Sequence, residues 1–325
     1  MRLIVLLLLA LAAALALSVA FGETPLSLAQ YVDAVAKPGS APAEILFGIR
    51  APRACCAALA GAALGLAGAV MQGLLRNPLA EPGVLGVSAW SGCAAALTIA
   101  FGLGAAPGAV EGAALGGALG AGAVVALLAA RFREPETLIL FGVALAALGG
   151  AAAALIFNLS PSPITMAEVL AWLQGSVTNR GWSDLAWALP PMALGAALCA
   201  YAAGGLRMLT LGDETAALSG LPMARLRVAA VAGAALLTGA SVAMAGVIGF
   251  VGLAAPHLVR GAASDDPARV LAPSAIAGAI LLTLADLLAR LIPTENELRL
   301  GVVTALFGAP LFALVAWRAA RSWRA

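Results

Sequence analysis

The stretch that decides the fold runs from Arg50 to Gly86 and reads RAPRACCAALAGAALGLAGAVMQGLLRNPLAEPGVLG. It opens with two arginines, Arg50 and Arg53, and continues as roughly 20 apolar and small residues, enough for a helix to cross a hydrocarbon core of about 30 Å. It closes on a polar segment that contains Pro78 and Pro82. The pattern predicts a membrane-spanning helix that links a charged site on one face of the membrane to an irregular segment on the other.

The composition of the whole chain is that of a membrane protein. Of its 325 residues, 62% are hydrophobic and 10% are charged, whereas soluble domains carry about a quarter charged residues. The 37 glycines suit helices that pack closely in lipid, and we expect such packing at the stripes Gly61/Gly65 and Gly112/Gly116/Gly120. Few aromatic residues and long unbroken apolar runs argue against a β-barrel. Membrane lipid is therefore an expected partner. Nucleic acid is not, because the net charge is +2.

The apolar runs predict an all-α, polytopic membrane protein in which residues 1–325 form one transmembrane domain. The stretch 228–262 is too long for one span, at about 52 Å by helical rise, and Gly246 and Gly249 mark a turn that divides it. Residues 3–21 end in a Ser-Val-Ala sequence typical of signal-peptide cleavage, but the length of the run favours an uncleaved first span. With the other runs, near 54–75, 84–104, 107–130, 137–158, 183–206, 269–290 and 300–317, the total is ten.

The basic residues predict the orientation in the membrane. Ten spans place both termini on one side, and with the termini inside, twelve of the 18 basic residues face the cytoplasm, as the positive-inside bias requires. We therefore expect a multi-pass protein of the bacterial inner membrane with both termini cytoplasmic. Arg50, Arg53 and Arg290 are exceptions on the outer face. They either anchor to lipid headgroups by snorkelling or capture acidic groups of an external protein.

The outer loop 159–182 predicts an amphipathic helix at about residues 165–175. Thr165 and Glu168 have the spacing of a capping box at its start. Met166, Val169, Leu170 and Leu173 follow at helical spacing on one face. We expect this helix to lie on, or dip into, the outer surface.

The inner segment of about residues 207–227 predicts a short cytoplasmic helix. Asp213 and Glu214 favour a helix start, and Gly220 and Pro222 stop the helix within about two turns. Such a helix would fit a partner's groove, although a solvated loop with one helical turn fits the pattern equally well.

The chain carries few groups that could do chemistry. It has no Walker A sequence and a single lysine, Lys37, so we expect no ATPase site, no catalytic residues and no cofactor on this chain. A lone histidine, His257, cannot build a metal site and is interpreted as a polar residue at a helix end. Asp286 precedes Arg290 by four residues, the favourable order for a helical ion pair, which is either structural or an intramembrane functional site.

The motifs together resemble the iron-chelate and cobalamin permeases of type II ABC importers, the FecCD family. The resemblance runs in order from about residue 50 to 312. It rests on Arg50-Ala51-Pro52-Arg53, Asn77-Pro78-Leu79-Ala80-Glu81-Pro82, Leu211-Gly212-Asp213-Glu214, Gly246–Leu253 with Pro256-His257, Ala285-Asp286 with Ala289-Arg290, and Gly308-Ala309-Pro310.

The resemblance implies an assembly as well as a fold. It implies ten membrane helices per subunit, a second permease subunit around a central pathway, two ATPase subunits that hold ATP and Mg, and a periplasmic binding protein. We expect a homodimer, with a paralogous partner as the alternative. The substrate would be an iron–siderophore, haem or cobalamin. The alternative function is a secondary transporter working alone.

The resemblance also implies roles for single residues. Arg50, Arg53 and Arg290 match arginines that receive glutamates of the binding protein. At Arg299 the family usually has proline, and here the arginine would add a docking contact or meet an anionic substrate. The cytoplasmic gate corresponds to Asn77 and Leu79, with Glu136 near a second gate loop. The segment that couples to the ATPase corresponds to Leu211, Gly212, Asp213, Glu214, Ala217, Leu218 and Gly220.

Overall fold

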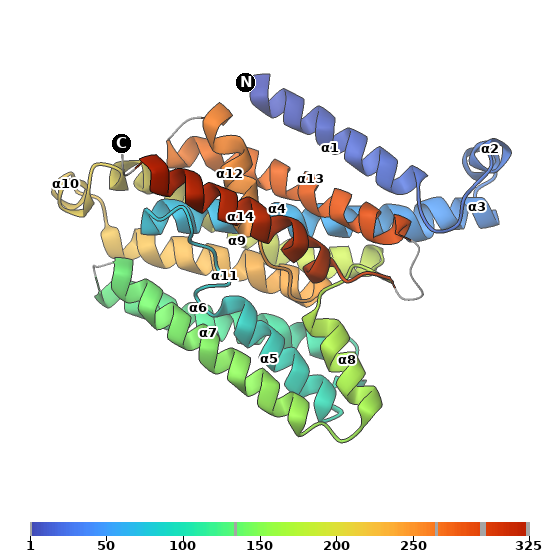
Figure 1. The fold of residues 1–325 in the computed structure, drawn as a ribbon, viewed down its shortest axis with the longest axis horizontal. Coiled ribbons are helices and arrows are strands. Elements are labelled where there is room, and N and C mark those ends of the chain that lie inside the picture. Colours follow the sequence, from blue (N-terminus) through green and yellow to red (C-terminus); the bar gives the residue numbers. More distant parts are fainter. Residues whose placement is uncertain (1, 133–134, 264–265, 293–296, 323–325) are drawn as a thin grey trace.

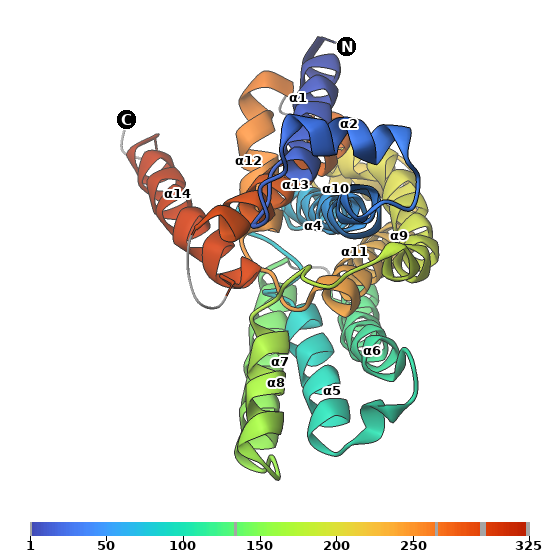
Figure 2. The same cartoon turned by 90° about the vertical axis from the view of Figure 1, so that its right-hand side faces the viewer.

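The protein is an all-helical bundle whose long helices run side by side (Figures 1 and 2). The computed structural model describes residues 2–132, 135–263, 266–292 and 297–322. A helix forms within each predicted apolar run. These helices are α1 (Arg2–Ala20), α4 (Ala51–Leu75), α5 (Val87–Ala100), α6 (Ala109–Arg131), α7 (Pro135–Asn158), α9 (Trp182–Leu209), α11 (Met223–Ala245), α12 (Val251–Ala263), α13 (Pro267–Leu291) and α14 (Leu300–Ser322).

The all-α polytopic class is confirmed, but the helices differ in length more than the apolar runs predict. In the described part of the chain, seven helices are long and apolar enough to cross a membrane. The helices α5 and α12 have only 14 and 13 residues. The run at 84–104 shortens because Gly86 and Gly102 take positive φ angles of 83° and 68°, which no α-helix contains.

Shorter elements lie at the two ends of the bundle. At one end, α2 (Leu28–Ala36), α3 (Ala41–Ala43) and a π-helical turn (Glu44–Arg50) lead directly into α4. At the opposite end lies α10 (Asp213–Leu218) (Figure 1). The helices α2 and α3 therefore lie at one end of the bundle, and α10 lies at the other.

The predicted outer amphipathic helix is α8 (Pro163–Leu173), and its predicted start is wrong. The N-cap is Ser162, whose hydroxyl accepts a hydrogen bond of 3.2 Å from the Thr165 N–H. Pro163 then occupies the first turn, where its missing N–H costs nothing. The Thr165/Glu168 pair therefore does not cap the helix. On the predicted apolar face, Val169 is fully buried.

The core centres on α4, which packs against α13, α11, α12 and α9. Glycines allow this approach: a Cβ on Gly61 would lie 2.2 Å from the Gly278 carbonyl oxygen of α13, and one on Gly68 would lie 1.9 Å from the Gly252 carbonyl oxygen of α12. Backbone therefore packs directly on backbone along α4, as the Gly61/Gly65 stripe predicts.

The second predicted stripe does not pack within this chain. A Cβ on Gly112, Gly116 or Gly120 of α6 would meet no described atom within 4 Å. Instead, α6 uses Gly117 and Gly122, which approach Trp90 of α5 and Ala235 of α11. Close packing of this stripe stays a prediction, because the four-residue spacing marks a helix face and does not show which neighbour covers it.

The predicted break in the stretch 228–262 is confirmed. The helix α11 ends at Ala245, and Gly246 takes a φ of 71°. Residues 246–250 are not helical, and α12 begins at Val251. In the end view, α4 lies near the centre and α14 stands apart from the layer of α5, α7 and α8 (Figure 2). The non-helical segment joins α11 to α12 and lies beside the end of α8 and the start of α14.

Candidate functional site

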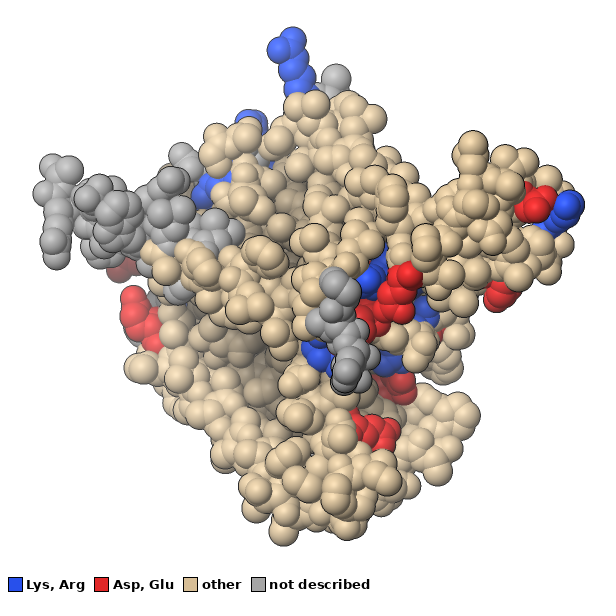
Figure 3. Space-filling view, turned by 45° about the vertical axis from the view of Figure 1, so that its right-hand side comes forward, with Lys and Arg blue, Asp and Glu red and all other residues tan. Residues whose placement is uncertain are grey.

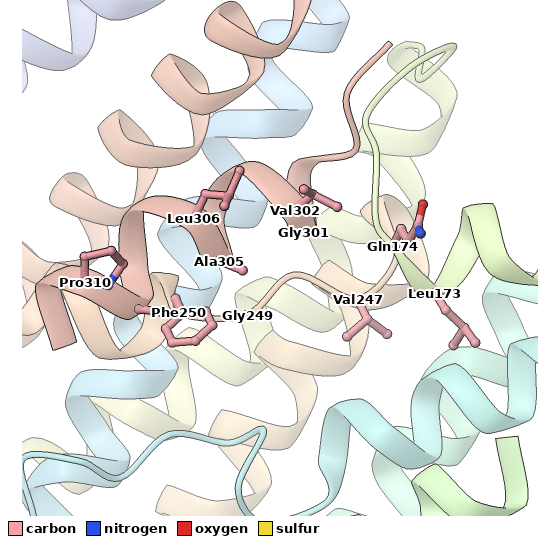
Figure 4. Close-up of a pocket in the computed structure, with 11 residues that line it drawn as sticks. Leu173, Gln174, Val247, Gly249, Phe250, Gly301, Val302, Ala305, Leu306 and Pro310 are labelled. Atoms are coloured by element: carbon pink, nitrogen blue, oxygen red, sulfur yellow. The ribbon is translucent and has the colours of Figure 1, made fainter. Parts of the chain in front are cut away.

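An apolar cavity of about 670 Å³ opens between α14, the end of α8 and the segment 246–250 (Figure 4). Its lining carries no charged side chain, and Gln174 supplies the one side-chain amide. Such a surface can accommodate a bulky solute without gripping it through ion pairs. The lining residues are Leu173, Gln174, Val247, Gly249, Phe250, Gly301, Val302, Ala305, Leu306, Ala309 and Pro310.

Backbone hydrogen bonds join the elements around this cavity. The Leu300 N–H donates to the Gly175 carbonyl at 3.0 Å, and the Gly301 N–H donates to the Gln174 carbonyl at 2.9 Å. The Ser176 N–H donates to the Ala245 carbonyl at 2.7 Å. The end of α8, the end of α11 and the start of α14 therefore form one hydrogen-bonded junction beside the cavity.

At the end of the bundle that carries α2, Arg50 is buried and holds the end of α1. Its guanidinium donates to the Ala20 carbonyl at 2.7 Å, to the Val19 carbonyl at 3.3 Å, and to the Thr24 carbonyl. Carbonyls at a helix end lack partners within the helix, so Arg50 satisfies groups that would otherwise need water.

A chain of four alternating charges lies beside Arg50. Arg53 donates to Asp286 Oδ1 from Nε at 3.0 Å and from Nη2 at 2.7 Å, and it also pairs with Glu297. Arg290 Nη2 lies 3.1 Å from Asp286 Oδ2 and 2.6 Å from the hydroxyl of Ser18. Asp286 is completely buried. The sequence spacing predicts the Asp286–Arg290 pair, which is confirmed, but it does not reveal Arg53 or Glu297 as partners.

The three arginines expected to receive an external protein are thus buried in this structure. Arg50, Arg53 and Arg290 all donate to acceptors of the same chain. Arg299 differs: it is half-exposed, and its guanidinium has no hydrogen bond or ion pair to any described residue. Figure 3 shows charged side chains gathered toward this end of the molecule, on an otherwise mostly uncharged surface. A docking role for the buried three stays a prediction, and it requires their present acceptors to be replaced.

Near the opposite end, the segment 76–86 contains the predicted gate residues. Arg76 takes a left-handed φ of 47° that ends α4. The Asn77 side-chain oxygen accepts a hydrogen bond of 2.9 Å from the Leu79 N–H, and so closes a local turn. Burial of its carboxyl raises the pKa of Glu81, in the same segment, to about 7. Glu136 is exposed at the start of α7 and is not hydrogen-bonded to Asn77 or Leu79 in the described part of the chain.

One side chain of α12 contacts this segment, and a second contacts the last turn of α4 before it. A ring nitrogen of His257 lies 3.0 Å from the Pro78 carbonyl oxygen, and Arg260 donates to the side-chain oxygen of Gln72 at 2.7 Å. His257 was expected to be only a polar residue at a helix end, so sequence reasoning missed its contact. The Pro78 carbonyl is 179 residues away, and no local spacing signals it.

The short helix predicted within the segment 207–227 is present as α10, and its cytoplasmic location stays a prediction. It follows Gly212 and is followed by Gly220, which have φ angles of 97° and 82°. Asp213 lies 3.2 Å from both Arg76 and Arg227, so it ties α10 to the gate segment and to α11. On the outside of the loop, Leu211 and Leu218 are 68% and 90% exposed, and Glu214, Ala217 and Gly220 are exposed as well.

The chain matches known proteins over almost its whole length. Residues 8–318 match the model of the FecCD transport family. The uncharacterized ABC transporter permease YvrB of Bacillus subtilis strain 168 is 39% identical, over 86% of this chain and 81% of the relative. The vitamin B12 import system permease BtuC of Salmonella schwarzengrund is also 39% identical, over 84% of this chain and 83% of the relative. A solved structure reported as an inward-facing metal-chelate type ABC transporter superposes with a TM-score of 0.87 at 29% identity, covering 98% of this chain and 99% of that one.

Proposed function

Because this chain belongs to the FecCD transport family of ABC importer permeases, we propose that it imports an iron–siderophore, haem or cobalamin. The chain is a permease subunit and not the importer's ATPase. The apolar cavity of about 670 Å³ carries the proposal, because its size and lack of charge suit a bulky chelate that must pass through without tight binding. Membership of the family also counts against the alternative of a secondary transporter working alone.

The proposed assembly is a homodimer of single-domain permeases with two ATPase subunits and a periplasmic binding protein. Leu306 and Phe307 of α14 are 66% and 68% exposed, which supports a second permease subunit facing that helix. The exposed leucines around α10 support a partner at that end. We place that end in the cytoplasm of the bacterium, with both termini, in accord with the distribution of basic residues.

Reconstitution tests the proposed function. The permease is combined with its ATPase and binding protein in proteoliposomes, and uptake of cobalamin, haem and an iron–siderophore is measured with and without internal ATP. We expect ATP-dependent uptake of one of them, with ATP hydrolysis stimulated by the binding protein. Uptake driven by a proton gradient without any ATPase would contradict the proposal.

We further propose that the Asn77–Leu79 turn is the inner gate and that Glu136 lies at a second gate loop. The hydrogen bond from His257 to the Pro78 carbonyl supports a defined closed position for the turn. The ion pair between Arg76 and Asp213 supports a link from α10 to the same segment. A displacement of α10 by the ATPase would thereby be transmitted to the gate segment.

Replacing Asp213 tests this link. Asp213→Asn removes the charge that holds both Arg76 and Arg227, so we expect substrate uptake per ATP hydrolysed to fall about tenfold, within the usual range of coupling free energies. The matched control is Glu44→Gln, which changes an exposed carboxylate at the opposite end of the bundle. Equal uptake per ATP in the two variants would contradict the proposed role of Asp213.

Arg299 is the accessible candidate for docking among the four predicted arginines. An exposed charge at an interface acts mainly on the association rate, so we expect Arg299→Glu to slow association of the binding protein about tenfold at low salt and less at high salt. Lys37→Glu, an exposed lysine that follows α2, serves as the control. If both substitutions slow association equally, Arg299 has no specific docking role.

A further inference from the structure

Glu297 and Asp286 both bind Arg53, but they are held very differently. The Asp286 side chain is 0% exposed, lies within α13 and contacts a second arginine, Arg290. The Glu297 side chain is 16% exposed and belongs to the non-helical segment just before α14. Its second partner is the Thr178 hydroxyl, which donates at 2.8 Å. Of the two carboxylates, Glu297 is therefore the one that can leave Arg53.

Glu297 also lies at the surface where another protein could reach it. It lines two hollows of about 370 Å³ each. One hollow includes Glu23 and Arg290, and the other includes Glu168 and Arg299. A side chain that enters either hollow would meet Glu297, with Arg53 directly behind it.

We propose that Glu297 is an internal competitor for the binding protein: it occupies Arg53 in the undocked permease and is displaced by an acidic side chain of the partner. The inference rests on the proposed function, because it assumes that a binding protein docks at this end. It extends that function by assigning the residue of this chain that the partner's carboxylate would replace.

Charge balance favours an exchange over simple addition. The two arginines and two carboxylates of the network sum to zero, so a third carboxylate entering beside Arg53 would face two like charges. Loss of Glu297 without replacement would leave a buried arginine poorly compensated. Replacement of one carboxylate by another keeps Arg53 paired throughout.

The ionisation state of Glu297 allows it to compete. Burial by itself would raise the pKa of Glu297, but hydrogen bonding to Arg53 and the charge of Arg53 lower it below the usual range. Glu297 is therefore ionised at neutral pH. A partner must supply a carboxylate with comparable geometry, which gives specificity for an acidic surface.

Displacement of Glu297 would also change the packing of α14 beside the apolar cavity. Glu297 lies three residues before Leu300, where α14 begins, and its partner Thr178 follows the backbone that holds Leu300 and Gly301. Displacement of Glu297 removes a side-chain link between α4 and the start of α14. Docking at Arg53 would thereby loosen a helix that lines the cavity.

Substitution of Glu297 tests the competition directly. Affinity of the binding protein for the permease in nanodiscs is measured by biolayer interferometry. Glu297→Gln removes the competing charge, so we expect affinity to rise about tenfold if the released state is about one-tenth populated in the wild type. Glu168→Gln is the matched control, since Glu168 lines the same hollow and makes no ion pair with a described residue. We expect it to leave affinity unchanged.

A second variant keeps the test decisive if Glu297→Gln does not fold. Thr178→Val removes the hydrogen bond that helps to hold Glu297, together with the hydrogen bond of 2.7 Å between the Thr178 and Ser176 hydroxyls. We expect it to raise affinity about threefold by the same arithmetic. Affinity that is unchanged or weaker in the folded variants overturns the competition, because a merely structural Glu297 would never oppose binding. If the wild type binds no binding protein, the proposed function itself is contradicted.

Discussion

An Arg53→Ala substitution lowers the free energy of unfolding by about 3–5 kcal/mol, the usual cost of removing one partner from a buried ion pair. The reason is that Arg53 serves two carboxylates at once. Without it, Asp286 keeps Arg290 as its only basic partner among the described residues, although its carboxylate is completely buried. Glu297 loses its ion pair in the same step.

Thermal unfolding of the detergent-purified protein measures this effect. Arg299→Ala is the control, because that guanidinium is half-exposed and has no described partner, and such surface substitutions usually change stability by less than about 0.5 kcal/mol. Equal melting temperatures for the two variants would show that the Arg53 network contributes little to the fold.

The same geometry limits how docking can be tested. Charge reversal at Arg53 would place a new carboxylate against Asp286 and Glu297, so a loss of partner binding would report misfolding as readily as docking. Substitutions at Glu297, Thr178 and Arg299 avoid this problem, because they leave the Arg53–Asp286 pair intact.

Local patterns predicted the features that depend on neighbours in sequence. Apolar runs located the helices, Gly246 located the break before α12, and Asp213 with Gly220 located α10. The spacing of Asp286 and Arg290 predicted their ion pair. Each of these depends on residues within a few positions, where helix geometry alone determines the contact.

The features that escaped prediction depend on residues far apart. Arg53 and Asp286 are 233 positions apart, and periodicity carries no information about which helices become neighbours. Hydropathy also treats an arginine at a span's end as facing water, whereas Arg53 turns inward because a carboxylate of α13 lies there. The roles of Glu297 and His257 became visible only when the packing of α4, α12 and α13 was known.

The glycine contact between α4 and α12 predicts a second large effect. A Cβ on Gly68 would lie 1.9 Å from the Gly252 carbonyl oxygen and 2.5 Å from its carbonyl carbon. These are backbone atoms, so no side chain can rotate away and the two helices must separate. We expect Gly68→Ala to cost at least about 3 kcal/mol, the upper end of typical overpacking.

Separation of α4 and α12 should also displace the gate segment 76–86. The helix α12 carries His257 and Arg260, whose bonds to Pro78 and Gln72 are 3.0 and 2.7 Å long. A shift of α12 by even 1 Å would break both, so any Gly68→Ala protein that folds should hydrolyse ATP with little uptake. Gly116→Ala is the matched control, because a Cβ there meets no described atom within 4 Å and alanine favours the helix by about 1 kcal/mol over glycine. Melting temperatures and uptake per ATP that match between the two variants would mean that α4 and α12 do not need this close approach.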